Sequence, residues 1–146
     1  MTVCLDGSEV AGKIAEALSD SVAGADKVAV TVTCPALYKV AELLKNTAGL
    51  EFDYLANLTA VDYTDYFEVV YHLVSLQHNH SLVLKTRCYD RGKPTVPSVI
   101  KLWRAADYQE REIYDLMGIT FEGHPDLKRL LLWEGFEGHP LRRDYL

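Results

Sequence analysis

The stretch YLANLTAVDYTDYFEVVYHLVSLQHNHSLVLKTRCY, residues 54–89, decides the fold because it contains three strand-like runs joined by two short turns. The runs cover Tyr54–Asp62, Tyr66–Leu76 and Ser81–Tyr89. Connections this short form hairpins, which pair consecutive strands in antiparallel fashion. In the third run apolar residues alternate with Lys85 and Arg87. We therefore expect one face of the sheet to be buried and the other to be charged.

Hydrophobic periodicity outside this stretch predicts four helices and one more strand. The predicted segments are a helix over Ser8–Ser19 with Ser8 as its N-cap, a strand over Lys27–Thr33, a helix over Pro35–Asn46, and short helices over Ser98–Trp103 and Asp107–Met117. Because hairpin-linked strands are mixed with helices, the chain is expected to be α+β. We expect a two-layer domain over residues 1–121, with a mixed sheet of about four strands and helices on one face. Residues 122–146 are expected to form an extended C-terminal tail.

Composition excludes several functional classes. The chain has 146 residues, of which 49% are hydrophobic, and this is enough for the core of one domain. A formal net charge of −6 argues against a nucleic-acid partner, which normally requires a basic surface. No apolar run approaches the roughly 18 residues of a membrane span, and the N-terminus has no secretory pattern. The simplest expectation is a soluble protein of a bacterial-type cytoplasm.

The cysteines are few and scattered. Cys4, Cys34 and Cys88 form no CxxC motif, and an iron–sulfur cluster typically requires four thiolates. We expect Cys34 and Cys88 to be small core residues in strands. Phosphate-binding glycine loops and the common serine-hydrolase and zinc-protease motifs are absent from the sequence. The chain is therefore expected to be a domain without a cofactor of its own.

The segment ADYQEREIYDLMG predicts a short helix with clear ends. Asp107 and Glu110 have the spacing of a capping box, with Asp107 as the N-cap, and Gly118 stands at the C-cap position. Glu110 and Glu112 cannot share one acid–base site, because side chains two residues apart on a helix point to opposite sides. Surface ion pairs of these carboxylates, with Arg111 pairing to Asp107 or Asp115, are the plain interpretation. A docking helix is the alternative.

Two histidine motifs could bind metal. The turn His78-Asn79-His80 is more simply an exposed polar turn. The sequence FEGHP occurs twice, at Phe121–Pro125 and at Phe136–Pro140, and would supply two Glu and two His. However, Gly permits a positive φ and Pro holds the preceding His in an extended conformation, so each copy is a kink followed by a straight exit. We expect two turns in a tail that lies along a surface, with metal binding as the alternative.

The C-terminal half resembles the signature of the C-type subunit of respiratory complex I, the proton-pumping NADH:quinone oxidoreductase. The resemblance is dense from about Val96 to Tyr145 and weaker from Ser8 to Cys88. The tail EGHPDLKRLLL followed by EGHPLRRDY strengthens it, whereas Trp133, Gly135 and Phe136 depart from the family pattern. The residues that carry it are Glu110, Arg111, Glu112, Asp115, Leu116, Met117, Gly118, His124, Lys128, Leu130 and Leu131, with Trp103 and Tyr108 ahead of them.

The resemblance implies a non-catalytic structural and assembly subunit in the hydrophilic arm of the complex. It implies an α+β domain that packs on the quinone-site subunit, of the D type, near cluster-bearing subunits of the B and I types, with the tail of residues 122–146 docking on a partner. It places FMN, the iron–sulfur clusters and quinone in partner subunits, and the chain at the cytoplasmic face of the cell membrane, attached only through the complex. Family-motif or docking roles follow by resemblance for Glu110, Arg111, Glu112, Asp115, His124, Lys128, Arg129, His139, Arg142 and Arg143.

Two other interpretations remain open from the sequence. The chain could be the equivalent subunit of a membrane-bound hydrogenase or of a quinone reductase fed by a donor other than NADH. More remotely, it could be a stand-alone metal-dependent enzyme that uses His78, His80, His124 and His139.

Overall fold

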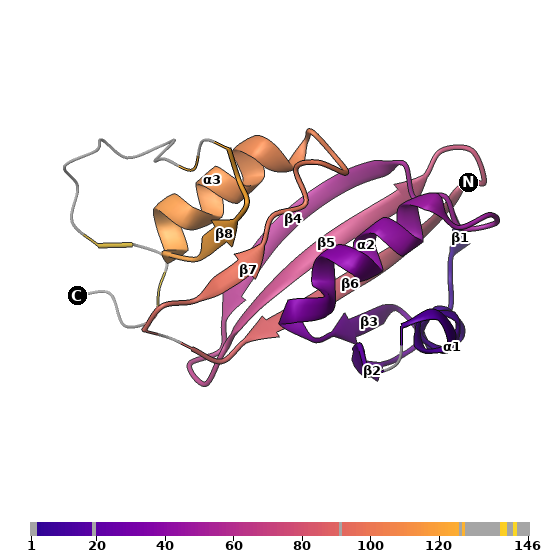
Figure 1. Ribbon diagram of the computed structural model, residues 1–146, viewed down its shortest axis with the longest axis horizontal. Helices are drawn as coiled ribbons and strands as arrows, with labels where there is room; N and C mark the ends of the chain where they lie inside the picture. The colour runs from indigo at the N-terminus through magenta and orange to yellow at the C-terminus, as the bar shows by residue number, and fades with distance from the viewer. Residues whose placement is uncertain are drawn as a thin grey trace.

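A mixed β-sheet forms the centre of the computed structural model, which describes residues 3–18, 20–90, 92–125, 127, 138–139 and 142 (Figure 1). Its strands are β1 (Val3–Cys4), β2 (Val22–Ala25), β3 (Ala29–Val32), β4 (Tyr54–Asp62), β5 (Phe67–Ser75) and β6 (His80–Cys88). The order is β2-β3-β6-β5-β4, and β1 pairs with β6 beyond the end of β3. β4, β5 and β6 are antiparallel, whereas β1 and β3 run parallel to β6. The α+β class and the mixed sheet are confirmed, with β1 and β2 added to the expected strands.

The remaining elements lie around this sheet. Two short strands, β7 (Thr95–Pro97) and β8 (Thr120–Glu122), form a separate parallel pair. The helices are α1 (Gly7–Ala17), the 3-10 turn η1 (Cys34–Ala36), α2 (Leu37–Asn46) and α3 (Ala106–Met117). In Figure 1, α2 crosses in front of β5 and β6, while β7 and β8 lie beside α3. The expected second layer is therefore present.

Helix α1 begins one residue earlier than predicted. Its N-cap is Asp6, whose side chain accepts a hydrogen bond from the backbone N of Ser8 at 2.9 Å, so the prediction of Ser8 as the cap was wrong. Gly7 is required at the first helical position because a Cβ there would collide with the backbone carbonyls of Asp26 and Ala29. This close approach holds α1 against the turn before β3.

The core lies between the helices and one face of the sheet. Helix α2 buries the stripe that the sequence predicted, made of Leu37, Val40, Ala41 and Leu44. Along β5 and β6, alternate side chains enter the same core, which also contains Trp103 and Phe52. The Trp103 indole Nε1 donates to the carbonyl oxygen of Phe52 at 3.0 Å, so its polar atom is satisfied in the core.

The helix predicted over Ser98–Trp103 is not formed. The chain makes turns there, and the backbone N atoms of Leu102 and Trp103 both donate to the carbonyl oxygen of Val99. The backbone N of Ser98 instead donates to the carbonyl oxygen of Glu122 at 2.8 Å, which continues the β7–β8 pairing by one residue. The strand therefore holds the start of this segment and leaves too few residues for a helix.

Helix α3 lies along β4 and covers part of its outer edge. The Gln109 side chain connects the two elements: its Oε1 accepts from the backbone N of Leu58 at 2.6 Å, and its Nε2 donates to the carbonyl oxygen of Ala105 at 3.0 Å. The N-cap residue is Ala105, not Asp107, and it makes no side-chain capping bond. The prediction of a capping box at Asp107 was wrong. Gly118 is the left-handed C-cap, as predicted, with φ of 78°.

Candidate functional site

Glu110 lies on α3 with its side chain completely buried, although the sequence indicated a surface position. Its carboxylate accepts two hydrogen bonds from the segment after β7. Ser98 Oγ donates to Oε1 at 2.6 Å, and the backbone N of Val99 donates to Oε2 at 3.0 Å. Burial raises the pKa of Glu110 from 4.5 to about 7, and these two hydrogen bonds oppose part of the rise. Glu110 therefore joins α3 to the turn segment, and its proton affinity is higher than that of an exposed carboxylate.

The first FEGHP copy contacts the N-terminal turn of α3. Gly123 has φ of 89°, and the following His124 places its Nε2 atom 3.0 Å from Oδ1 of Asp107. The His124 side chain is fully covered, whereas the Asp107 side chain is 37% exposed. Asp107 stands in the first turn, where a carboxylate also interacts favourably with the helix dipole. The residue predicted as a cap therefore holds the repeated motif instead.

The second copy contacts the other end of the same helix. Gly138 has φ of 88°, and His139 Nδ1 lies 2.9 Å from the carbonyl oxygen of Asp115. Since a carbonyl can only accept, Nδ1 carries the proton in this contact. The ring lies against Gly118, where a Cβ would stand only 2.7 Å from His139 Cδ2. A glycine is therefore needed at the C-cap for two reasons: its φ is positive, and His139 occupies the space where a side chain would lie.

The two histidines lie too far apart to share a metal ion. Their partners Asp107 and Asp115 are eight residues apart on α3, which corresponds to roughly 12 Å along the helix. Within the described residues, no group of three or more His, Cys, Asp or Glu side chains could hold a metal. Both described glycines have the positive φ that the sequence predicted, and both histidines contact one helix of the same chain.

The other motif residues divide between the interior and the surface. Asp115 is completely buried, whereas Glu112 is exposed and Arg111 lies over the ring of the exposed Tyr108 at 5.6 Å. The Arg142 guanidinium lies 5.0 Å from the Phe67 ring, and its backbone N donates to the carbonyl oxygen of His139. Lys128, Arg129 and Arg143 lie outside the described residues.

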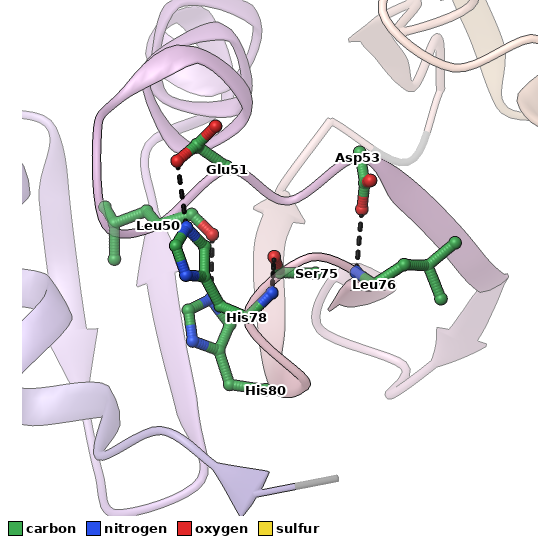
Figure 2. A network of polar contacts seen from close by, with 7 residues as sticks. All are labelled: Leu50, Glu51, Asp53, Ser75, Leu76, His78 and His80. Carbon is green, nitrogen blue, oxygen red and sulfur yellow. Dashed lines mark hydrogen bonds and ion pairs between the residues drawn. The ribbon is translucent and has the colours of Figure 1, made fainter.

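The histidines of the β5–β6 turn close a loop (Figure 2). His78 Nε2 lies 2.8 Å from Glu51, and this hydrogen bond lowers the pKa of Glu51. His80 is buried, contrary to expectation, and its Nε2 lies 2.7 Å from the carbonyl oxygen of Leu50. Asp53 accepts from the backbone N of Leu76 at 2.9 Å in the same network. These contacts join the segment before β4 to the β5–β6 turn, so His78 and His80 have a structural role.

Sequence reasoning missed the partners of Glu110. Ser98 follows a proline and was assigned to a helix, so nothing local indicated that its hydroxyl and the next backbone N would bind a buried carboxylate. Tyr71 was missed as well: its hydroxyl is buried and has no hydrogen-bond partner in the described part of the chain. Burial and the charge of Glu110 raise the pKa of Tyr71 well above 10, which keeps the hydroxyl neutral.

A family model described as the respiratory-chain NADH dehydrogenase 30 kDa subunit matches residues 30–146, a region that contains α3 and both FEGHP copies. The chain belongs to this 30 kDa subunit family.

Relatives from bacteria and yeast support membership of the 30 kDa subunit family. The C-type subunit of NADH-quinone oxidoreductase from Roseiflexus castenholzii is 40% identical over 149 residues, covering 97% of this chain and 85% of that protein. The corresponding protein of Coxiella burnetii is 40% identical over 159 residues, covering 85% and 69%. A mitochondrial protein of Candida albicans named NADH dehydrogenase [ubiquinone] iron-sulfur protein 3 is 43% identical over 123 residues, covering 82% and 43%.

The fold of the 30 kDa subunit family also occurs in another respiratory assembly. A chain in the solved structure of the membrane-bound sulfane sulfur reductase, an archaeal respiratory membrane complex, matches with a TM-score of 0.75. The match covers 94% of this chain and 84% of that chain, at 24% identity. At this identity the match shows the shared fold alone.

The cysteines of this family member do not fit an iron–sulfur cluster, despite the name of the yeast relative. The sequence contains only three cysteines, one fewer than such a cluster typically needs. Cys4 is exposed, Cys34 is partly buried and Cys88 is buried. Burial raises the pKa of the Cys34 thiol to about 11, which opposes the thiolate form that ligates iron.

Among the described residues, no helix is long and apolar enough to cross a membrane.

Proposed function

We propose that this chain is a non-catalytic structural and assembly subunit in the hydrophilic arm of a membrane-bound NADH:quinone oxidoreductase. Such a complex couples electron transfer from NADH to quinone with proton translocation. The chain would lie peripherally at the cytoplasmic face of the membrane, attached through other subunits. Family membership and the relatives named as C-type subunits of NADH-quinone oxidoreductase support this proposal.

One observation carries the non-catalytic part of the proposal. The groups on and around α3 that could perform acid–base or metal chemistry are engaged inside the domain. Glu110 binds the segment after β7, and His124 and His139 bind the two ends of α3. Because these contacts stabilise the fold, we assign the redox chemistry to FMN, iron–sulfur clusters and quinone held by partner subunits.

The partners are a quinone-site subunit of the D type and cluster-bearing subunits of the B and I types. The exposed side of α3 offers a surface for them, since Tyr108 is 63% exposed and Glu112 is exposed. Lys128, Arg129 and Arg143 are proposed docking residues of the tail. Glu110 and Asp115 are buried, so any contribution they make to docking acts through the position of α3.

Deletion of the chain followed by re-expression tests this function. Membranes without the chain are expected to lose NADH:quinone activity, and re-expression of the full chain should restore it. The purified chain should neither oxidise NADH nor show flavin or iron–sulfur absorbance. A stoichiometric chromophore in the purified chain, or full NADH:quinone activity without it, would contradict the proposal.

A related complex with another electron donor is the second candidate. The fold shared with the sulfane sulfur reductase chain favours it, since the same architecture occurs outside NADH-oxidising complexes. Membranes assayed with NADH and with alternative donors separate the two, because only the first candidate requires NADH-dependent activity. A stand-alone metal enzyme is the remote alternative, and stoichiometric zinc or iron in the purified chain would favour it.

A further inference from the structure

The sheet face turned away from the core carries apolar side chains where polar ones are expected. In β4, β5 and β6, residues that alternate with the buried ones include Val61, Val70 and Val83. Val61 is 37% exposed, and Val28, just before β3, is 53% exposed. The solvated face of an antiparallel sheet is normally polar. The valines therefore form an apolar patch among polar side chains, and such exposed patches often mark interaction sites.

The valines line a hollow of about 530 Å³ on this face. Its walls also include Tyr63, Glu68, His72 and Lys85. The hollow is open and mainly apolar, so a neighbouring chain can place side chains in it. Five of the residues that line this hollow, which we call the valine face, are Val28, Val61, Val70, Val83 and Lys85.

Tyrosines extend the valine face at the β4–β5 turn. The ring centroid of Tyr66 lies 5.3 Å from that of Tyr63 and 5.3 Å from that of Tyr89. The Arg87 guanidinium lies 4.8 Å from the Tyr66 ring, and hydrogen bonds to Tyr89 and Glu68 raise the pKa of Arg87. Tyrosine and arginine are the residues that most often dominate binding at protein interfaces. Here their side chains are already held in place, which lowers the entropy cost of binding.

Two cations on this face, Lys85 and Arg87, lie beside the same carboxylate, Glu68. The Glu68 side chain is only 5% exposed and lies 3.1 Å from Arg87 and 3.7 Å from Lys85. The Arg87 contact is a hydrogen bond, whereas the Lys85 distance is too long for one. Asp26 and Lys27 at the rim of the hollow carry opposite charges. The four charged residues that line the hollow, Asp26, Lys27, Glu68 and Lys85, balance one another, and Arg87 beside them adds one positive charge.

We propose that the valine face docks a partner subunit of the respiratory complex, through an apolar segment that fills the hollow and a carboxylate that pairs with Lys85. This inference rests on the proposed function, because it requires an assembly with other subunits. A second copy of this chain fits less well. A two-fold dimer through this face would bring Lys85 and Arg87 toward the same cations of the other copy, and like charges at an interface are unfavourable.

Two readouts on the assembled complex test the inference. The tagged chain, expressed as the only copy, is purified with its complex from solubilised membranes. In a Cys4→Ser background, Val61→Cys should react with a maleimide in the isolated chain and be protected in the complex. Lys85→Glu should lower the yield of complex at least about tenfold, since like-charge contacts cost several kcal/mol. Lys85→Arg should retain wild-type yield, because it keeps the charge.

A matched control separates docking from general effects of charge and folding. Lys13 is exposed on α1, and Lys13→Glu makes the same charge change away from the valine face. Its complex yield should equal that of the wild type. The denaturant midpoint of purified Lys85→Glu shows whether the variant folds, and the maleimide readout of Val61→Cys is independent of that variant.

The possible outcomes keep this inference separate from the proposed function. If the wild-type chain co-purifies with no other subunit, the proposed function fails. If the complex forms but Val61→Cys reacts in it as fast as in the isolated chain, docking at the valine face is overturned and the function stands. Protection in the isolated chain together with a dimeric mass would assign the face to a second copy. Equal loss of yield in Lys13→Glu would also overturn the inference.

Discussion

The two FEGHP copies have the same sequence and the same glycine conformation, yet they bind α3 by different chemistry. The glycine φ is 89° in the first copy and 88° in the second. His124 meets the side-chain carboxylate of Asp107, whereas His139 meets the backbone carbonyl of Asp115. The described glycines therefore share one backbone conformation, whereas the end of the helix that each histidine meets determines its interaction.

This difference in chemistry predicts that the two contacts contribute unequally to the stability of the folded chain. The contact at the first copy involves a carboxylate that is 37% exposed, and water weakens polar contacts of exposed groups. The second copy depends on contact with Gly118, where no side chain can be accommodated. We therefore expect steric changes at the second copy to destabilise the isolated chain more than charge changes at the first copy.

The largest effect is expected from Glu110→Ala, which weakens the support of the helix that both copies bind. It leaves the Ser98 hydroxyl and the Val99 backbone N without their acceptor in the interior. The free energy of unfolding should fall by roughly 3–4 kcal/mol, measured by denaturant titration. Glu110→Gln, which retains an acceptor, should lose much less. Equal losses in the two variants would mean that these hydrogen bonds do not stabilise α3.

The pH dependence of stability follows from the same carboxyl group. The pKa of Glu110 is raised from 4.5 to about 7, so the folded state binds the proton more tightly than the unfolded state. Its contribution to stability is fully present below pH 4.5 and is lost as the pH rises to about 7, by at most about 3 kcal/mol. Denaturant midpoints of the wild type at pH 5 and pH 8 should show this fall. Glu110→Gln should not show it, and an unchanged slope in that variant would assign the pH dependence to other groups.

The substitutions Gly118→Ala and Gly123→Ala together measure how much the steric contact with His139 contributes to stability. Both glycines have a positive φ, but a Cβ at Gly123 meets no atom within 4 Å, whereas one at Gly118 meets His139. Gly123→Ala should cost about 1 kcal/mol, and Gly118→Ala about 2–3 kcal/mol. In a His139→Ala background the additional destabilisation caused by Gly118→Ala should disappear. If the additional destabilisation persists in that background, the new methyl group does not clash with His139.

The smallest effect is expected from Asp107→Ala at the first copy. Loss of a partly exposed polar contact should cost about 0.5–1 kcal/mol, measured by the denaturant midpoint at constant slope. In a His124→Ala background the same substitution should have almost no effect. If the cost is the same in both backgrounds, Asp107 acts on the helix end and not on the repeated motif.

The sheet was predictable because its strands are long and periodic. β4 has the predicted bounds, Tyr54–Asp62, and the predicted hairpins place β5 and β6 beside it. β1 and β2 were missed because they contain two and four residues, and β2 contains a glycine. Elements of this length form only because a neighbouring strand supplies their hydrogen bonds, which no local pattern indicates.

The site around α3 was only partly predictable. The glycines of FEGHP correctly indicated a positive φ, since the effect of glycine on the backbone is local. The roles of Asp107 and Glu110 were predicted wrongly, because their spacing fits a capping box but their actual partners are distant in sequence. His124 binds Asp107, and the segment after β7 supplies both donors to Glu110. Local spacing cannot distinguish a helix cap from a buried carboxylate when the competing donors come from elsewhere in the chain.

Gln109 has a consequence for the subunit before it joins its complex. Its side-chain oxygen occupies the backbone N of Leu58 on the outer edge of β4, which no other strand of the described sheet covers. An edge strand with free backbone groups is a template for pairing with the edges of other molecules, and this leads to aggregation. By occupying one of these groups, α3 makes β4 a poor template. The helix that binds both FEGHP copies thus also occupies part of the open edge of the sheet.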